Sequence, residues 1–153
     1  MTPGGARRGG PWVREAFFCD AAIEGKDGVF TYVRAVDRIA HHVVRPDAPA
    51  VLEPFDHDFV IVVGMVAGDA LGRSTVHLAL QRPDGALHEL GQYEVAWEKP
   101  NRGQRVVLRA RVRVESEGLH WLVVEIDDFN DGHRRVLTQS PLEITYVRNA
   151  PPR

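Results

Sequence analysis

The chain of 153 residues has little cysteine, lysine or serine, and it lacks a long apolar run. Its single cysteine, Cys19, cannot form an intramolecular disulfide, so nothing indicates an oxidising compartment. The longest uninterrupted apolar stretch, Phe59 to Val63, is far shorter than the roughly 20 residues of a membrane-spanning helix. Residues 1–10 contain no apolar segment of the kind that secretory signals require. These absences predict a cytoplasmic protein.

An excess of charge of one sign is also missing. The chain has 19 Lys and Arg residues against 21 Asp and Glu residues, which gives a formal net charge of −2. A general nucleic-acid-binding protein needs basic residues in excess on one face, and an anionic membrane attracts the same kind of surface. We therefore expect neither nucleic acid nor membrane as a partner.

Motifs of the common enzyme classes are absent. The sequence contains no Gly-x-Ser-x-Gly elbow, no phosphate-binding loop and no dinucleotide fingerprint. Cys19 falls on a predicted apolar strand, which is not the exposed, electropositive setting of a nucleophile. A pair of catalytic carboxylates on distant strands would leave no motif, and nothing singles one out. The sequence predicts a protein that is not an enzyme, with no catalytic residues and no cofactor.

The chain does contain alternating apolar and polar residues, broken by turns with glycine. This pattern predicts an all-β protein, an antiparallel immunoglobulin-like β-sandwich of about seven to nine strands. The stretch His41–Pro54 contains three prolines and is predicted to cross between the sheets outside any ladder. The predicted strands are Val13–Glu24, Val29–Ile39, Phe55–Ala67, Arg73–Gln81, Ala86–Glu98, Arg105–Glu115, Leu119–Asp127, His133–Leu137 and Leu142–Arg148.

The length fits one domain with its own core. We expect a single domain over residues 13–148, a flexible tail over 1–12 and a short tail over 149–153. The residues predicted to fill the core are Ile61, Val63, Val76, Leu78, Tyr93, Val95, Trp97, Leu108, Ala110, Val112, Leu122, Val124, Ile126, Ile144 and Tyr146.

Loop length predicts the register of two hairpins that turn at Asp-Gly sequences, residues 27–28 and 84–85. In an antiparallel hairpin, the turn fixes which residues face each other across the strands. The first register produces an apolar face and a pair of opposite charges. The predicted pairs are Ala21 with Val33, Cys19 with Ala35, Asp20 with Arg34, Val76 with Tyr93 and Ser74 with Val95.

A third predicted hairpin turns at Ser116–Gly118 and places three arginines on one strand face. In this register Arg109 faces Glu125, Arg111 faces Val123, and Arg113 faces Trp121. Pairing with acids and a cation–π contact are the ordinary explanation of such a stripe. The alternative is a binding interface, because Arg and Trp are frequent at binding hot spots. The predicted binding residues are Arg109, Arg111, Arg113 and Trp121.

No motif for a metal site stands out. The acidic loop after residue 126 fails as an EF-hand, because Phe129 would occupy a position that requires an oxygen ligand. A tight turn explains its composition, and a looser calcium site of Asp127, Asp128 and Asp131 is the alternative. The seven histidines lack the spacing of zinc ligands, so we expect scattered surface histidines and no metal site.

The N-terminal third carries a resemblance to a known family. The sequences Phe18 to Ala22, Asp27-Gly28 and Val36 to Ile39 resemble the opening of an uncharacterised bacterial family of small all-β domains of unknown function. The resemblance covers about 25 residues and the general order of strands. It implies a sandwich fold and a function that is not enzymatic, and it supplies no site residues.

These observations favour a non-enzymatic binding or assembly module that mediates protein–protein interaction or self-association. A sheet edge or a loop tip would contact the protein partner or the second copy in a homo-oligomer. The first alternative is a small-ligand or carbohydrate-binding domain assisted by calcium at the acidic loop. The second is a hydrolase with dispersed carboxylates, which predicts a deep pocket with convergent acids.

Overall fold

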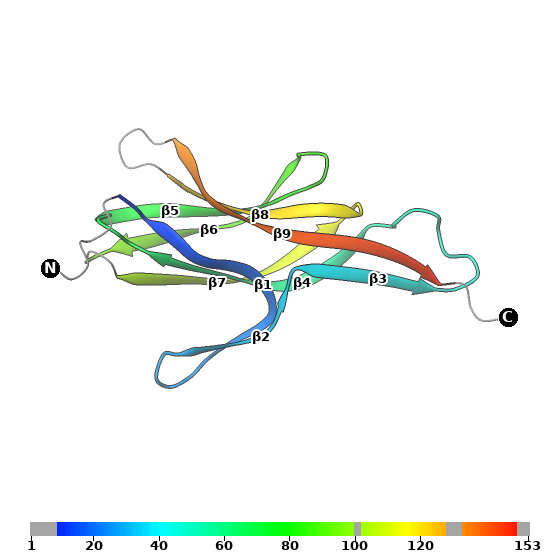
Figure 1. The fold of residues 1–153 in the computed structure, drawn as a ribbon, viewed down its shortest axis with the longest axis horizontal. Coiled ribbons are helices and arrows are strands. Elements are labelled where there is room, and N and C mark those ends of the chain that lie inside the picture. The colour runs from blue at the N-terminus through cyan, green and yellow to red at the C-terminus, as the bar shows by residue number, and fades with distance from the viewer. Residues whose placement is uncertain (1–8, 100–101, 128–132, 150–153) are drawn as a thin grey trace, which may run out of the picture.

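The computed structural model describes residues 9–99, 102–127 and 133–149. Nine strands form two sheets that pack face to face (Figure 1). Sheet A has the strand order β2-β1-β4-β7, and sheet B has the order β3-β9-β8-β5-β6. The strands are β1 (Trp12–Glu24), β2 (Phe30–Val36), β3 (Arg38–Val44), β4 (Phe55–Val66), β5 (Gly72–Gln81), β6 (Leu87–Trp97), β7 (Gly103–Val114), β8 (Gly118–Asp127) and β9 (Arg134–Asn149).

The topology is immunoglobulin-like. Strands β1, β4 and β7 take the places of strands A, B and E in one sheet, and β5, β8 and β9 take those of C, F and G in the other. Strand β6 extends the second sheet, and β3 pairs with β9 in parallel at its far edge. The predicted all-β sandwich is confirmed. Within the described ranges, no helix is long and apolar enough to cross a membrane.

The predicted core lies between the sheets. Eleven of its fifteen residues are buried, and Tyr93, Leu108, Ala110 and Tyr146 pack against them while partly exposed. Strand β4 is buried on both faces from Phe59 to Met65. A strand covered on both faces reads as a continuous apolar run, which explains the longest such run in the sequence.

The two hairpins at Asp-Gly sequences have the predicted registers near their centres. Ala21 faces Val33 in the first, and Val76 faces Tyr93 in the second. Gly28 and Gly85 both adopt positive φ, which glycine tolerates without steric cost. A β-bulge after Leu78 then shifts the second hairpin by one residue toward its turn. The turn residues therefore sufficed to predict these local pairings.

The third predicted hairpin is wrong. Strand β7 pairs with β4 in sheet A, whereas β8 pairs with β5 and β9 in sheet B. Gly118 does adopt a positive φ, but the short connection leads from one sheet to the other. Alternation along two adjacent strands cannot distinguish a hairpin from such a crossing, because both leave one apolar face toward the core.

Two further strand boundaries differ from the prediction. The predicted strand Val29–Ile39 is divided at Asp37, where the chain passes from β2 in sheet A to β3 in sheet B. Strand β3 continues through residues 41–44, which were assigned to the crossover. The last two predicted strands form one strand, β9, despite Pro141. Pairing with β3 begins at Glu143, so the missing N–H of this proline interrupts no bond to β3.

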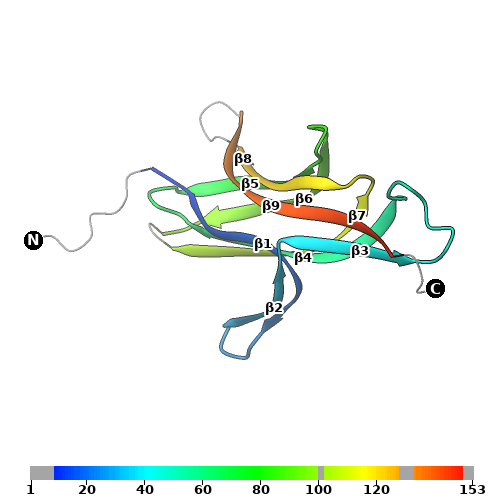
Figure 2. The same cartoon turned by 45° about the vertical axis from the view of Figure 1, so that its right-hand side comes forward.

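The first hairpin projects from the sandwich as a two-stranded ribbon (Figures 1 and 2). Strand β1 pairs with β4 only from Trp12 to Cys19, and beyond that point it pairs with β2 alone. We call residues 20–34 the ribbon. Arg34, at its foot, is the non-glycine residue with positive φ (50°) in the described part of the chain.

Candidate interaction surface

One face of the ribbon packs on the outer face of sheet A. Cys19, Val60 and Val62 are buried there, with Phe17, Ala22, Tyr32 and Val107 packed around them. The rings of Phe17 and Tyr32 meet edge to face, with their centroids 5.1 Å apart. The Arg105 guanidinium lies 5.0 Å from the centre of the Phe30 ring, within cation–π range. These contacts anchor a two-stranded element that would be marginal alone.

The other side of the ribbon exposes apolar side chains. Ile23 is 56% exposed, Val29 63% and Val33 42%. Strand β2 is the last strand of sheet A, so its outer backbone edge has no strand neighbour among the described residues. The ribbon therefore combines apolar side chains with an open hydrogen-bonding edge.

The three predicted arginines lie on the outer face of sheet A, but their neighbours are not those predicted. Arg111 and Arg113 face Asp58 and Asp56 on β4. The Arg111 guanidinium donates to both carboxylate oxygens of Asp58, at 2.8 and 3.2 Å, and Arg113 donates to Asp56 at 3.3 Å. The Arg111 guanidinium thereby lowers the pKa of Asp58.

Arg109 differs from the other two arginines. It faces Val60 and forms no ion pair with any residue that the structure describes. Its side chain borders a shallow depression of about 300 Å³, together with Asp20, Asp58 and Arg111. Asp20 pairs with Arg34, 2.6 Å away, as the sequence predicted. The depression therefore has one positive charge that its own acids do not neutralise.

Trp121 is not part of this surface. It lies on β8 in sheet B, where its neighbours are Gln81 on β5 and Pro141 on β9. The predicted contact of Trp121 with Arg113 is wrong, because their strands belong to different sheets. Glu125, the predicted partner of Arg109, instead lies 3.8 Å from Arg134.

The expectation of scattered surface histidines is wrong at two positions. His77 is 5% exposed and His120 is 1% exposed. The Nδ1 atom of His120 lies 3.0 Å from the Gly118 carbonyl oxygen. When Nδ1 carries the proton, it donates a hydrogen bond to that oxygen. Burial lowers the pKa of His120, which favours its neutral form. Alternation placed His77 on the solvent face of β5 and could not reveal the side chains that cover it.

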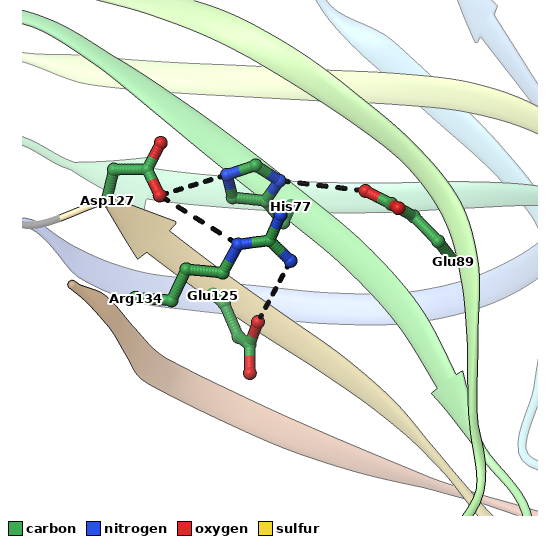
Figure 3. Close-up of polar contacts among 5 residues, drawn as sticks. All are labelled: His77, Glu89, Glu125, Asp127 and Arg134. Atoms are coloured by element: carbon green, nitrogen blue, oxygen red, sulfur yellow. Dashed lines mark hydrogen bonds and ion pairs between the residues drawn. The ribbon is translucent and has the colours of Figure 1, made fainter. Parts of the chain in front are cut away.

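His77 lies in a polar cluster on sheet B (Figure 3). Its Nε2 atom is 3.1 Å from Asp127. Its buried Nδ1 atom, 3.7 Å from Glu89, has no hydrogen-bond partner among the described residues. Arg134 approaches both Glu125 and Asp127, at 3.8 and 4.0 Å. These five residues come from β5, β6, β8 and β9, and no sequence motif connects them.

Two other sites considered from the sequence are the calcium site at the acidic loop and Cys19. Asp128 and Asp131 of the alternative calcium site lie outside the described residues, and Asp127 is engaged by His77. Within the described ranges, no group of three or more His, Cys, Asp or Glu side chains is arranged to hold a metal ion. Cys19 is fully buried, and burial raises the pKa of its thiol. This is the setting of a core residue and not of a nucleophile.

Comparison with known proteins gives similarity to solved structures alone. No protein-family model and no curated protein sequence matches the chain, so the family resemblance of the N-terminal third stays a prediction. Among solved structures, the chain is similar to the CARDB domain of a Pyrococcus furiosus protein, solved in complex with di-metal ions. The TM-score is 0.42 at 11% sequence identity, over 90% of this chain and 96% of that one.

Proposed function

We propose that this protein is a non-enzymatic assembly module that associates with a second copy of itself through the open edge of the ribbon. The observation that carries the proposal is the sequence along that edge, which runs Val-Phe-Thr-Tyr-Val from residue 29 to residue 33. Its β-branched and aromatic residues favour strands, and it has no charge, proline or glycine to oppose pairing.

The segment is also symmetric about Thr31. When two copies pair antiparallel around a two-fold axis at Thr31, each Val29 faces a Val33, and each Phe30 faces a Tyr32. Thr31 of one copy faces Thr31 of the other. In a dimer with two-fold symmetry the same surface of both copies forms the interface, so a strand with a palindromic sequence is complementary to the same strand of the other copy. Aromatic, β-branched and Thr–Thr pairs are among those that stabilise sheets.

The backbone supports the same register. The N–H of Gly25 donates to the Val29 carbonyl at 2.8 Å, within the first hairpin. Hydrogen-bonding direction alternates along a strand, so Thr31 and Val33 also direct their backbone groups toward β1. Phe30 and Tyr32 therefore direct theirs outward. These are the two positions that must exchange hydrogen bonds in a pairing centred on Thr31.

Charges at the ends of the segment are compatible with the pairing. In this register Arg34 of one copy faces Gly28 of the other, next to Asp27. The positive φ of Arg34 interrupts the regular strand and limits the pairing to about five residues. Arg109, which forms no ion pair within the described residues, is the candidate for a further contact with a carboxylate of the bound copy.

Sedimentation equilibrium of the purified protein tests the proposal. The wild type should be a dimer, and Thr31→Lys, which brings two ammonium groups face to face, should raise its dissociation constant roughly 100-fold. Leu87→Lys is the matched control, because Leu87 is 59% exposed on β6, far from the ribbon in sequence and in the other sheet. It should leave the dimer intact.

A wild type that remains monomeric at all concentrations would contradict self-association. Equal weakening by Thr31→Lys and Leu87→Lys would contradict the role of the ribbon. A complex that forms with another protein, and that Thr31→Lys disrupts, would replace the second copy by a different partner at the same edge.

A further inference from the structure

We propose that His77 and Glu89 bind a zinc ion on the outer face of sheet B. The buried Nδ1 atom of His77 has no hydrogen-bond partner among the described residues (Figure 3). A buried polar atom without a hydrogen bond costs free energy, so it calls for an explanation. The residue His77 is 95% buried, and its Nδ1 atom points toward the carboxylate of Glu89.

The tautomer of His77 follows from its other nitrogen. The Asp127 carboxylate accepts hydrogen bonds and cannot donate one while ionised, so the Nε2 atom, 3.1 Å away, carries the proton. In a neutral ring Nδ1 is then unprotonated, and its lone pair faces the carboxylate of Glu89. Two negative ends facing each other repel, so a cation or a second proton must lie between them.

The charge of the cluster favours a divalent cation over a proton. Three carboxylates, those of Glu89, Glu125 and Asp127, meet one guanidinium, that of Arg134. Among the described residues of the cluster, three negative charges and one positive charge leave −2 around a neutral imidazole. The adjacent pair of Arg73 and Glu94 is neutral by itself. A divalent ion would cancel this charge, whereas a proton on His77 would leave −1.

The distance fits a bridging ion. The Nδ1 atom of His77 and the Oε1 atom of Glu89 are 3.7 Å apart. Two metal–ligand bonds of about 2.1 Å span that gap at an angle of about 125°, wider than the tetrahedral angle.

The ligand types favour zinc over calcium and magnesium. An imidazole nitrogen with a carboxylate oxygen suits zinc, whereas calcium and magnesium prefer oxygen ligands alone. Asp127 would act as a positioning residue, because a carboxylate that accepts the second N–H of a zinc-bound histidine fixes the ring and its tautomer. Two protein ligands leave positions for water or for a group from another molecule.

Calorimetric titration of tag-free, chelator-treated protein with zinc chloride tests the site. The wild type should bind one zinc ion, and Glu89→Gln should lower its affinity at least 10-fold. Glu94→Gln, on the same strand but paired with Arg73, is the control and should bind as the wild type does. Asp127→Asn should lower the affinity by about 10 to 100-fold while leaving the stoichiometry unchanged.

Two results would overturn the site. One is zinc binding that is absent in the wild type or equal in Glu89→Gln, which would place any bound ion elsewhere. The other is a nitrogen-15 spectrum in the presence of zinc that shows both nitrogens of His77 protonated. That spectrum would identify an imidazolium bridging Asp127 and Glu89 without metal.

Discussion

The two edge strands of sheet A, β7 and β2, differ in how they are protected. Strand β7 carries several arginines, and hydrogen bonds between β7 and strand β6 of sheet B cover its edge. The Tyr93 hydroxyl donates to the Val107 carbonyl at 3.1 Å, and the Gln104 amide donates to the Ala96 carbonyl at 2.9 Å. Strand β2 has one charged residue, Arg34, which pairs with Asp20. Its segment from Phe30 to Val33 has no charge and, among the described residues, no neighbour of this kind. Since sheet edges are ordinarily blocked against pairing, an open edge in the same sheet indicates a surface for association.

The largest expected effect comes from removing the support of the ribbon. Val62 is fully buried beneath it, so Val62→Asp places an unpaired carboxylate in an apolar cluster. We expect a loss of about 3 kcal/mol or more in the free energy of unfolding, measured in urea. Leu87→Asp, at an exposed position, should change it by less than about 0.5 kcal/mol. Similar values for both variants would contradict the burial of sheet A beneath the ribbon.

The second prediction converts the protected edge into an open one. Replacing Arg109, Arg111 and Arg113 by threonine removes three of the four arginine charges of β7 and introduces residues that favour strands. We expect new association beyond the dimer, detected by light scattering as a mass that rises with concentration. Replacement of the same three residues by lysine keeps the charge and should not cause it. Unchanged mass in the threonine variant would show that the charges of β7 do not protect its edge.

The smallest effect concerns the ion pair of Asp58 and Arg111 beside that edge. The guanidinium lowers the pKa of Asp58 in the folded protein below its ordinary value near 4. The ion pair therefore makes its full contribution to the free energy of unfolding above that ordinary value. The contribution is lost as the pH falls through the lower pKa that Asp58 has in the folded state. It is small because both side chains are exposed.

Urea unfolding of the wild type and Arg111→Gln measures this effect. The wild type should be slightly more stable at about pH 6, and the difference should shrink toward about pH 2 as Asp58 is protonated. If the difference in stability between the two proteins stays constant over this pH range, the effect comes from packing of the Arg111 side chain and not from its charge.

Local sequence signals predicted the sandwich, most of its core and two registers. The Asp-Gly turns explain this success, because they fix the pairing of strands that follow each other directly. The ion pair of Asp20 and Arg34 followed from the first of these registers. The connection of β7 to β8 offered the same kind of signal, a short loop with glycine, and led to the wrong partners for three arginines.

The remaining site features depend on strands that are distant in sequence. Asp58 and Arg111 are separated by 53 residues, and His77 and Asp127 by 50. Residue periodicity carries no record of which strands become neighbours in a sheet. One signal did exist for the ribbon, since the apolar run from Phe59 to Val63 requires cover on both faces of β4.

Disulfide cross-linking through Thr31→Cys measures directly whether two ribbons pair around Thr31. The proposed two-fold axis places residue 31 opposite its own copy, at a Cα separation of about 4.5 to 5.5 Å that suits a disulfide. Native Cys19 is fully buried and serves as the unreactive background. The proposal predicts that mild oxidation rapidly converts Thr31→Cys to a covalent dimer, whereas Leu87→Cys remains monomeric on a reducing-agent-free gel. Equal rates for the two variants would contradict pairing of the ribbons.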